Sequence, residues 1–332
     1  MNKKVSLTGI KPTGMPHLGN YIGSIKPALE LAHDYDARYF IADYHALNQI
    51  KDPVKLKDMT FEVAAAWLAC GLDPNQVLFY RQSDVPETFE LAIALMAFTP
   101  KGLMNRAHAY KALTQKNAEE GNPLDDGVNI GLFTYPILMA ADILLFDADL
   151  VPVGNDQLQH IEMANDIAQS LNFNYKTEIL KLPQPFTHKE AGLVVGLDGR
   201  KMSKSYNNEI SLFLPEKKLR KTIMKIVTNS QTIEEPKDPD NCNVFSLYKV
   251  FATSQQQSEL RAKYLAGGMG WGHAKEALFE AINAQLKAPR EKYFELLERR
   301  DYVDKILLEG AEKARDIASQ TISRLRKSIG ID

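Results

Sequence analysis

The sequence predicts a doubly wound α/β fold built on a parallel sheet. Three runs rich in β-branched and aromatic residues, Val5–Ile10, Ala37–Asp43 and Val77–Gln82, are typical of buried strands. The two runs between them, Leu18–His33 and Val54–Ala69, carry apolar residues at helical spacing. Strands that alternate with helices in this way form a parallel sheet with right-handed crossovers.

The chain after these elements continues with mixed structure. We expect further helix over Phe89–Asn117 and a loop over Glu119–Asn129, where acidic residues, Gly, Asn and Pro gather. A helix over Tyr135–Phe146, a short strand over Asp149–Val153 and a helix over Asp156–Ser170 follow.

The second part of the chain has a different pattern. After a stretch punctuated by glycines, Gly192–Asn208, the sequence from Pro215 onward is mostly helical and rich in Lys, Arg and Glu. We therefore expect two domains, an α/β domain over residues 1–210 and an all-α domain over residues 211–332.

The composition is that of a globular protein. Of the 332 residues, 45% are hydrophobic and 25% charged, and the formal net charge is −2. A nucleic-acid partner would therefore need a local basic surface. The two cysteines, Cys70 and Cys242, lie outside any CxxC or Cys/His cluster, which argues against zinc, an iron–sulfur cluster or a disulfide framework.

Nothing in the sequence predicts a membrane segment. The basic start MNKK is not followed by the apolar run of a signal peptide. The most apolar stretch, Tyr135–Phe146, is interrupted by Asp142 and is too short to span a bilayer. We therefore expect a cytoplasmic protein.

A turn of unusual composition follows the first strand. Residues 11–20 read KPTGMPHLGN, which matches neither GxGxxG nor GxxxxGK[ST]. The turn still places a helix N-terminus at the carboxyl edge of the sheet, where open α/β sheets bind ligands and where anionic phosphate is favoured. Gly19 and Gly23 are expected on one helical face, so that a flat group can approach. A tight structural turn with His17 at the surface is the alternative.

The predicted helix over Tyr135–Phe146 contains a carboxylate among apolar residues. Tyr135, Met139 and Asp142 fall at i, i+4 and i+7, on one helical face. A buried carboxylate needs a donor. Two possibilities are open at this point, a salt bridge to an Arg or Lys, or a pocket wall that accepts an N–H from a ligand.

Two further segments have the chemistry of a nucleotide site. Residues 151–160 read VPVGNDQLQH, a strand, a glycine and a helix start at which Asn155 or Asp156 would be the N-cap. A generic helix cap is the alternative. Residues 201–205 read KMSKS and place two lysines on a loop entered through Gly199. A solvated basic loop is the alternative there.

Taken together, these segments resemble the tryptophanyl members of the class I aminoacyl-tRNA synthetases. PTGMPHLGN resembles the HIGH signature in its tryptophanyl form, and YPILMAADIL, VPVGNDQLQH and KMSKS resemble the other signatures. The segment GAEKA at residues 310–314 resembles the C-terminal helix, so the resemblance covers nearly the whole chain. It implies a Rossmann-like catalytic domain over residues 1–210 and a helical tRNA-binding domain over 211–332.

The resemblance implies how ATP is held. His17, Lys201 and Lys204 are the expected catalytic residues because they contact the phosphates. The turn backbone and the Val194 backbone meet the nucleotide, and the Gly-x-Asp segment holds the ribose. Lys11 stands where many relatives have Gln, and Asn155 where many have Glu. The implied ATP-binding residues are Lys11, Pro12, Thr13, Gly19, Asn20, Gly154, Asn155, Asp156, Val194, Lys201, Met202, Ser203, Lys204 and Ser205.

The resemblance also implies how the amino acid is selected. Asp142 would accept the indole N–H, Tyr135 and Met139 would line the pocket, and Gln157 would reach the amino acid. A site built around a buried polar partner rejects analogues that lack the matching group by roughly 10⁴–10⁵. Lys111 is a further candidate for a phosphate contact, and His160 is expected to be structural.

The implied reaction is activation of L-tryptophan by ATP, with Mg²⁺, and transfer to tRNA(Trp) by a homodimer. Catalysis would rest on positioning and charge neutralisation. Basic clusters could contact tRNA phosphates: Lys217, Lys218, Arg220, Lys221, Lys225, Arg324, Arg326 and Lys327.

Three alternatives to this reaction were weighed. A nucleotidyltransferase with the same core is disfavoured by the complete KMSKS and the helical second part. A non-catalytic RNA-binding paralogue is disfavoured by the intact His17, Asp142, Lys201 and Lys204. Tyrosine specificity is disfavoured by the Gly-Asn ending of the first motif and by the AADIL context of Asp142.

Overall fold

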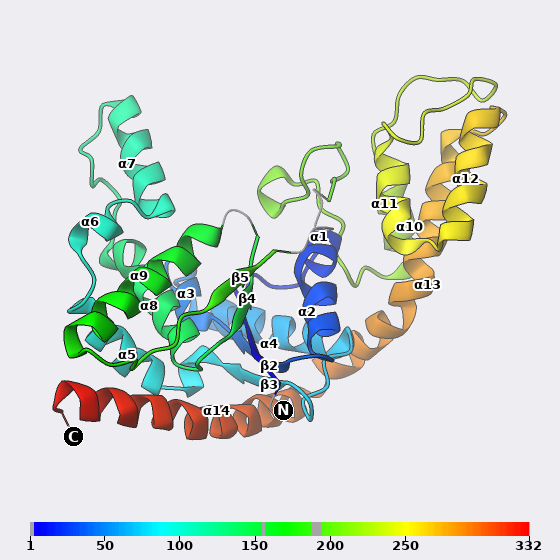
Figure 1. Cartoon of the computed structure of the whole chain (residues 1–332). Helices are drawn as coiled ribbons and strands as arrows, with labels where there is room; N and C mark the ends of the chain where they lie inside the picture. Colours follow the sequence, from blue (N-terminus) through cyan, green and yellow to red (C-terminus); the bar gives the residue numbers. More distant parts are fainter. Residues whose placement is uncertain (1–2, 155–156, 188–193, 332) are drawn as a thin grey trace.

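The computed structural model describes residues 3–154, 157–187 and 194–331 (Figure 1). The sheet in it has five parallel strands in the order β3-β2-β1-β4-β5. The predicted doubly wound α/β fold is therefore confirmed, and the first predicted strand has the predicted bounds. The strands are β1 (Val5–Ile10), β2 (Asp36–Ile41), β3 (Leu78–Arg81), β4 (Leu150–Pro152) and β5 (Gln184–Phe186).

Both faces of the sheet are buried. Leu7 and Phe40 belong to one apolar core, and Tyr39 and Ile41 belong to the other. This alternation follows from the two-residue period of a strand, and burial on both faces is typical of parallel sheets. Because all strands run in the same direction, their carboxyl ends lie at one edge, and the loops that follow them build the functional site.

Nine α-helices and one π-helix belong to the described α/β part. On the core that contains Tyr39 lie α1 (Leu18–Asn20), the π-helix η1 (Tyr21–Ile25), α2 (Lys26–Leu31) and α4 (Pro53–Ala69), with α3 (Asp43–Ala46) after β2. The others are α5 (Glu87–Met96), α6 (Lys101–Met104), α7 (His108–Glu120), α8 (Ile130–Leu144) and α9 (Leu158–Tyr175).

The predicted helices differ from the structure in three places. The helix expected over Leu18–His33 contains the π-helix η1, and Asp43 begins α3 rather than ending a strand. The expected helix Phe89–Asn117 is divided into α5, α6 and α7, with Pro100 at the start of α6. Helix α8 begins earlier than expected, because the Asn129 side chain accepts from the Leu132 backbone N–H as an N-cap.

The last third of the described chain is helical, with no strand after Pro215 in the residues described. Helices α10, α11 and α12 project from the sheet as a lobe, and α13 runs from this lobe back to α4 of the α/β part (Figure 1). In the described part, no helix has the length and apolar character needed to cross a membrane. The helices are α10 (Glu216–Ile223), α11 (Asn243–Phe251), α12 (Ser254–Ala266), α13 (Trp271–Leu297) and α14 (Arg300–Ile329).

Helix α14 leaves this lobe and returns to the sheet. It runs under the α/β part (Figure 1) and packs along the edge strand β3. The approach is close, because a Cβ built on Gly310 would lie 1.9 Å from the carbonyl oxygen of Phe79. A covered edge strand has no free backbone groups for pairing with another chain.

The domain boundary near residue 210 stays a prediction.

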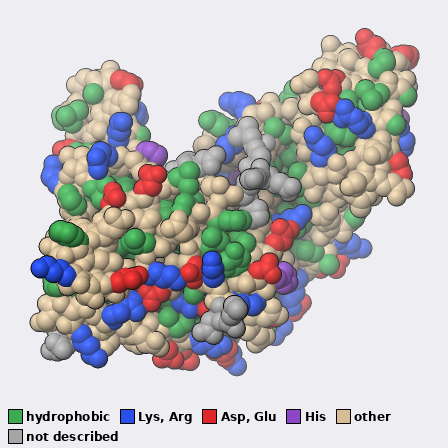
Figure 2. Space-filling model, in the orientation of Figure 1, with side chains coloured by type: hydrophobic (Ala, Val, Ile, Leu, Met, Phe, Trp, Pro, Cys, Tyr) green, Lys and Arg blue, Asp and Glu red, His purple; other side chains and the backbone are tan. Residues whose placement is uncertain are grey.

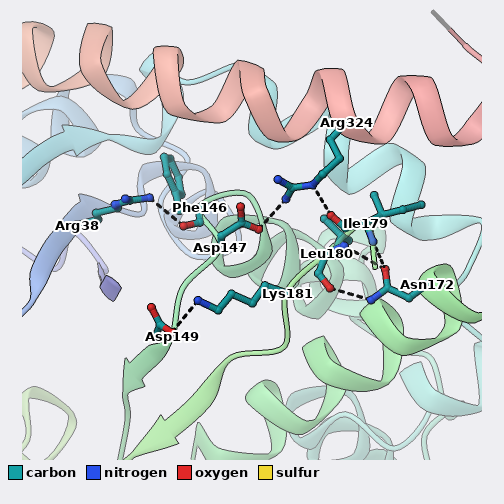
Figure 3. A network of polar contacts seen from close by, with 9 residues as sticks. All are labelled: Arg38, Phe146, Asp147, Asp149, Asn172, Ile179, Leu180, Lys181 and Arg324. Atoms are coloured by element: carbon teal, nitrogen blue, oxygen red, sulfur yellow. Dashed lines mark hydrogen bonds and ion pairs between the residues drawn. The ribbon is translucent and has the colours of Figure 1, made fainter. Parts of the chain in front are cut away.

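Ion pairs fix α14 at the amino edge of the sheet (Figure 3). Arg324 donates to the Ile179 carbonyl at 2.6 Å and to the Asp147 carboxylate at 2.7 Å. Arg326 forms two bonds of 2.6 Å with the Glu90 carboxylate. Both arginines therefore pair with carboxylates in this structure, and their expected contact with tRNA phosphates stays a prediction.

Candidate active site

The first turn positions His17 as the N-cap of α1. The His17 Nδ1 accepts from the Asn20 backbone N–H at 3.2 Å, and the Asn20 Oδ1 accepts from the His17 N–H at 3.0 Å. Because Nδ1 is an acceptor, the neutral ring carries its proton on Nε2. The reciprocal cap therefore fixes both the orientation and the tautomer of the imidazole.

Electrostatics keep the His17 ring neutral. Burial lowers its pKa below the ordinary value, and the nearby Lys204 ammonium lowers it further, against a smaller opposing effect of Glu209. The side chain is 9% exposed. The site thus offers an Nε2–H donor without adding a positive charge.

The KMSKS loop is docked onto this turn. The Gly19 N–H approaches the Met202 Sδ at 3.3 Å, and the Lys204 ammonium donates to the Thr13 carbonyl. The following segment pairs with the turn, since the Leu18 N–H donates to the Ile210 carbonyl at 2.8 Å. Two signatures that are more than 180 residues apart in the sequence therefore form one surface.

Asn208 organises the loop and was missed in the sequence analysis. Its side chain is 3% exposed and bonds Asp198 at 2.6 Å, the Lys201 carbonyl at 3.1 Å and the Ser203 N–H at 2.9 Å. The Asn208 amide and Arg200 lower the pKa of Asp198 to about 2. No motif singled this residue out, because its role depends on a turn that only the fold reveals.

A cavity of about 470 Å³ opens between the first turn and β4. Gly19 and Gly23 both line it, as expected for a surface on which a flat group lies. The Gln157 N–H donates to the Gly154 carbonyl at 2.9 Å, which shapes the second wall. Asn155 and Asp156 lie outside the described residues. The predicted ATP residues in the lining are Lys11, Thr13, Gly19, Asn20 and Gly154, with Gln157 from the predicted tryptophan set.

The remaining predicted ATP residues surround this cavity or the loop. Val194 accepts from the Met202 N–H at 2.8 Å, and the Ser203 and Ser205 hydroxyls are 2.8 Å apart. Pro12 is buried in the turn, and the Lys201 side chain is exposed. Lys111 is exposed on α7, on the arm that borders a hollow in the molecular surface (Figure 2).

Asp142 is held by two residues that the sequence analysis missed. The Gln82 Nε2 donates to both carboxylate oxygens, at 2.8 and 2.9 Å, and the His45 Nε2 lies 2.9 Å from Oδ2. Asp142 is 3% and Gln82 1% exposed. The partners in the described structure are therefore an amide and an imidazole, rather than the Arg or Lys left open by the sequence.

The ionisation of Asp142 reflects competing effects. Burial raises the pKa of the carboxyl above its ordinary value, while hydrogen bonds from His45 and Gln82 act in the opposite direction. Oδ1 accepts one bond and Oδ2 accepts two, so acceptor capacity remains at Oδ1 for a further donor. A buried carboxylate of this kind is suited to select a ligand that carries an N–H.

Aromatic rings extend from Asp142 along α8. The His45 and Tyr135 rings meet edge to face at 6.4 Å, and the Tyr135 hydroxyl lies 3.2 Å from the His160 Nε2. Burial raises the pKa of Tyr135, which keeps its hydroxyl neutral. Met139, one turn before Asp142, is half-buried. The predicted residues Tyr135 and Asp142 thus both contact His45. His160, which was expected to be structural, contacts the Tyr135 hydroxyl.

The described residues contain no group of three or more His, Cys, Asp or Glu placed to hold a metal ion. The cavity lining in this part of the chain contains no carboxylate.

Comparison with known proteins agrees with this geometry. Residues 2–287 match the family model of the class I tRNA synthetases (W and Y). The tryptophan–tRNA ligase of Bordetella parapertussis is 51% identical over the full chain, which spans 74% of that relative. The tryptophan–tRNA ligase of Neisseria meningitidis is 49% identical, covering 100% of this chain and 99% of the relative.

Solved structures have the same fold. A tryptophanyl-tRNA synthetase from Campylobacter jejuni, complexed with ADP and tryptophan, superposes with a TM-score of 0.89 at 46% identity and covers 98% of this chain and 99% of that one. The enzyme from Mycoplasma pneumoniae gives 0.80 at 31% identity, with 99% and 98% covered. The resemblance inferred from the sequence is confirmed: the chain belongs to the class I tRNA synthetases of the tryptophan and tyrosine branch.

Proposed function

We propose that this protein is a tryptophan–tRNA ligase. It activates L-tryptophan with ATP to form tryptophanyl-adenylate and pyrophosphate, and then transfers the tryptophanyl group to the 3′-terminal ribose of tRNA(Trp). The relatives that match along the whole chain are named tryptophan–tRNA ligases. ATP and tryptophan are the substrates of the first step.

The observation that carries the choice of tryptophan is the buried Asp142 carboxylate held by Gln82 and His45. An indole N–H that reaches Asp142 meets an acceptor whose position is already fixed. Phenylalanine offers no donor and would leave the carboxylate without its ligand partner, at a cost of several kcal/mol. Tyr135, Met139 and Gln157 complete the proposed tryptophan site.

Activation joins a carboxylate oxygen of tryptophan to the α-phosphorus of ATP. The bond between the α-phosphorus and the bridging oxygen breaks, and pyrophosphate leaves with the electron pair. Charge grows on the phosphate oxygens, so catalysis depends on donors and cations placed around them. The His17 Nε2–H and the ammonium groups of Lys201 and Lys204 are the proposed donors.

The remaining ATP contacts follow from the same arrangement. The backbone of Lys11–Thr13, the glycine surface at Gly19 with Asn20, and Val194 with Met202 would hold the nucleotide. Ser203 and Ser205 shape the loop, and Gly154 is the proposed ribose contact. Mg²⁺ would be coordinated mainly by the phosphates and would neutralise part of their charge.

The second step requires tRNA to reach this site. We assign tRNA binding to the helical part over residues 211–332, where basic side chains of α10 are exposed. Arg220 of that cluster already pairs with Glu276 at 2.8 Å, which leaves the neighbouring lysines as the better candidates. A homodimer located in the cytoplasm completes the proposal.

ATP–pyrophosphate exchange with tryptophan, tyrosine and phenylalanine, measured in parallel, tests this function. Exchange that depends on tryptophan and is weak with the other two is expected. A preference for tyrosine would assign the chain to the other branch of the family, and no exchange with any of them would refute the proposal.

A further inference from the structure

Lys11 differs from every other described residue that lines the cavity. The other described residues of the lining are apolar, glycine or neutral polar residues, and among those described only Lys11 carries a charged side chain. They come from β1, the first turn, η1, α2, α4, β4 and β5 and from the segments that follow β4 and β5. The residue follows β1 directly, at the carboxyl edge of the sheet. The Lys204 ammonium, which contacts the lining residue Thr13, belongs to the KMSKS loop, so the role of the Lys11 ammonium remains to be assigned.

The partner of the Lys11 ammonium is neutral. Its Nζ donates to the Gln49 Oε1 at 3.1 Å, and no ion pair of Lys11 occurs within the described residues. Partial desolvation lowers the pKa of the ammonium, and no carboxylate acts in the opposite direction. A neutral amide holds an ammonium less strongly than an anion does, so a bound anion would replace this bond at low cost.

The position of Gln49 indicates which anion. Gln49 follows α3, the helix that carries His45, and its N–H donates to the Ala46 carbonyl at 2.9 Å. His45 in turn contacts Asp142. The Lys11–Gln49 bond therefore lies beside the segment that carries His45, a partner of Asp142, while Gly19 approaches Met202 of the KMSKS loop.

We propose that the Lys11 side chain is the counter-ion of the tryptophan α-carboxylate, an inference that rests on the proposed function. On binding, the ammonium exchanges Gln49 for the carboxylate. This ion pair stabilises the bound substrate before the carboxylate attacks phosphorus. Because a ground-state interaction lowers KM and does not raise kcat, the role belongs to substrate binding and positioning.

Isothermal titration with two ligands tests the proposal. L-Tryptophan carries the carboxylate and tryptamine lacks it, while both carry the indole and the amino group. For Lys11→Gln we expect tryptophan to bind about fivefold more weakly, as for a partly exposed ion pair, and tryptamine to bind as in the wild type. Lys11→Arg should retain most of the affinity for tryptophan.

Lys51→Gln is the matched control. Lys51 lies on the same segment as Gln49, and its ammonium donates to the Leu47 carbonyl at 2.6 Å. The Lys51→Gln variant should bind tryptophan and tryptamine with the wild-type affinities. Equal losses for tryptophan and tryptamine in Lys11→Gln, no loss for either, or a loss confined to ATP would each overturn the carboxylate assignment. Failure of the wild type to bind tryptophan would instead refute the proposed function.

Discussion

The side-chain amide of Gln82 donates to both carboxylate oxygens of Asp142, across 60 positions of sequence. The same amide accepts from the Tyr44 backbone N–H at 3.1 Å, so its NH₂ group is forced toward the carboxylate. Asp142 is therefore oriented before any substrate arrives. Such preorganisation is what a selective polar contact requires.

Replacing Gln82 by Leu should weaken tryptophan binding without changing ATP binding. The carboxylate would lose a donor to both oxygens, and only His45 would then compensate for its burial. We expect KM for tryptophan in pyrophosphate exchange to rise about tenfold, the equivalent of about 1.4 kcal/mol. Gln76→Leu is the control, since Gln76 is exposed and bonds Asp73 at the surface. A KM for tryptophan that stays at the wild-type value would contradict the role given to Gln82.

His17→Asn should separate the structural and catalytic roles of His17. Asparagine is a good N-cap, so the free energy of unfolding should change by less than about 1 kcal/mol. The Nε2–H donor is lost, and kcat for pyrophosphate exchange should fall about 10²-fold, as for removal of one transition-state donor. Urea unfolding and steady-state exchange are the measurements. A variant with wild-type kcat would show that the ring does not act on the phosphates.

Stability should depend on pH through the same residue. The ordinary histidine value is 6.5, and burial lowers the pKa of His17 in the folded state. At pH values between the lowered pKa of the folded state and 6.5, the unfolded chain binds more protons than the folded protein does. This contribution to stability is therefore complete above pH 6.5 and is lost as the pH falls below 6.5. Urea unfolding at about pH 7.5 and about pH 5.5 should show a smaller decrease for His17→Asn than for the wild type. Equal decreases would contradict the assignment.

Gly310→Ala should destabilise the protein through the contact between α14 and β3. The new methyl group would overlap the Phe79 carbonyl, and overpacking costs about 1–3 kcal/mol. Gly272→Ala, at the start of α13, is a matched control because its Cβ would meet nothing within 4 Å. The control should be neutral or stabilised by up to about 1 kcal/mol. Equal unfolding free energies for the two variants would show that α14 adapts to the methyl group.

Much of the fold was predictable because it depends on local patterns. The alternating runs around Val5–Ile10 and Val54–Ala69 determine a strand and a helix directly. The π-helix η1 inserts one residue into a helical turn without disturbing the apolar pattern enough to be seen. Strand β5 is three residues long and includes Pro185, so it has no strand signature. The return of α14 to β3 depends on tertiary packing at Gly310.

The candidate site likewise contains some residues that the sequence indicates and others that only the fold brings to the site. His17, Lys204 and Asp142 belong to contiguous motifs, and the family resemblance of those motifs singled them out in the sequence. Gln82 and His45 belong to no motif, and the contacts of both residues with Asp142 are long-range in the sequence. Both follow the carboxyl end of a strand, and this position was the signal available in the sequence.

The central claim is that Asp142 selects the indole N–H. The most direct test compares kcat/KM in pyrophosphate exchange for tryptophan and for β-(3-benzothienyl)alanine, an isostere in which sulfur replaces the N–H, using the wild type and Asp142→Ala. The wild type should prefer tryptophan by roughly 10²-fold or more, and the variant should lose most of that preference while its KM for ATP stays unchanged. An undiminished preference in Asp142→Ala would contradict the account.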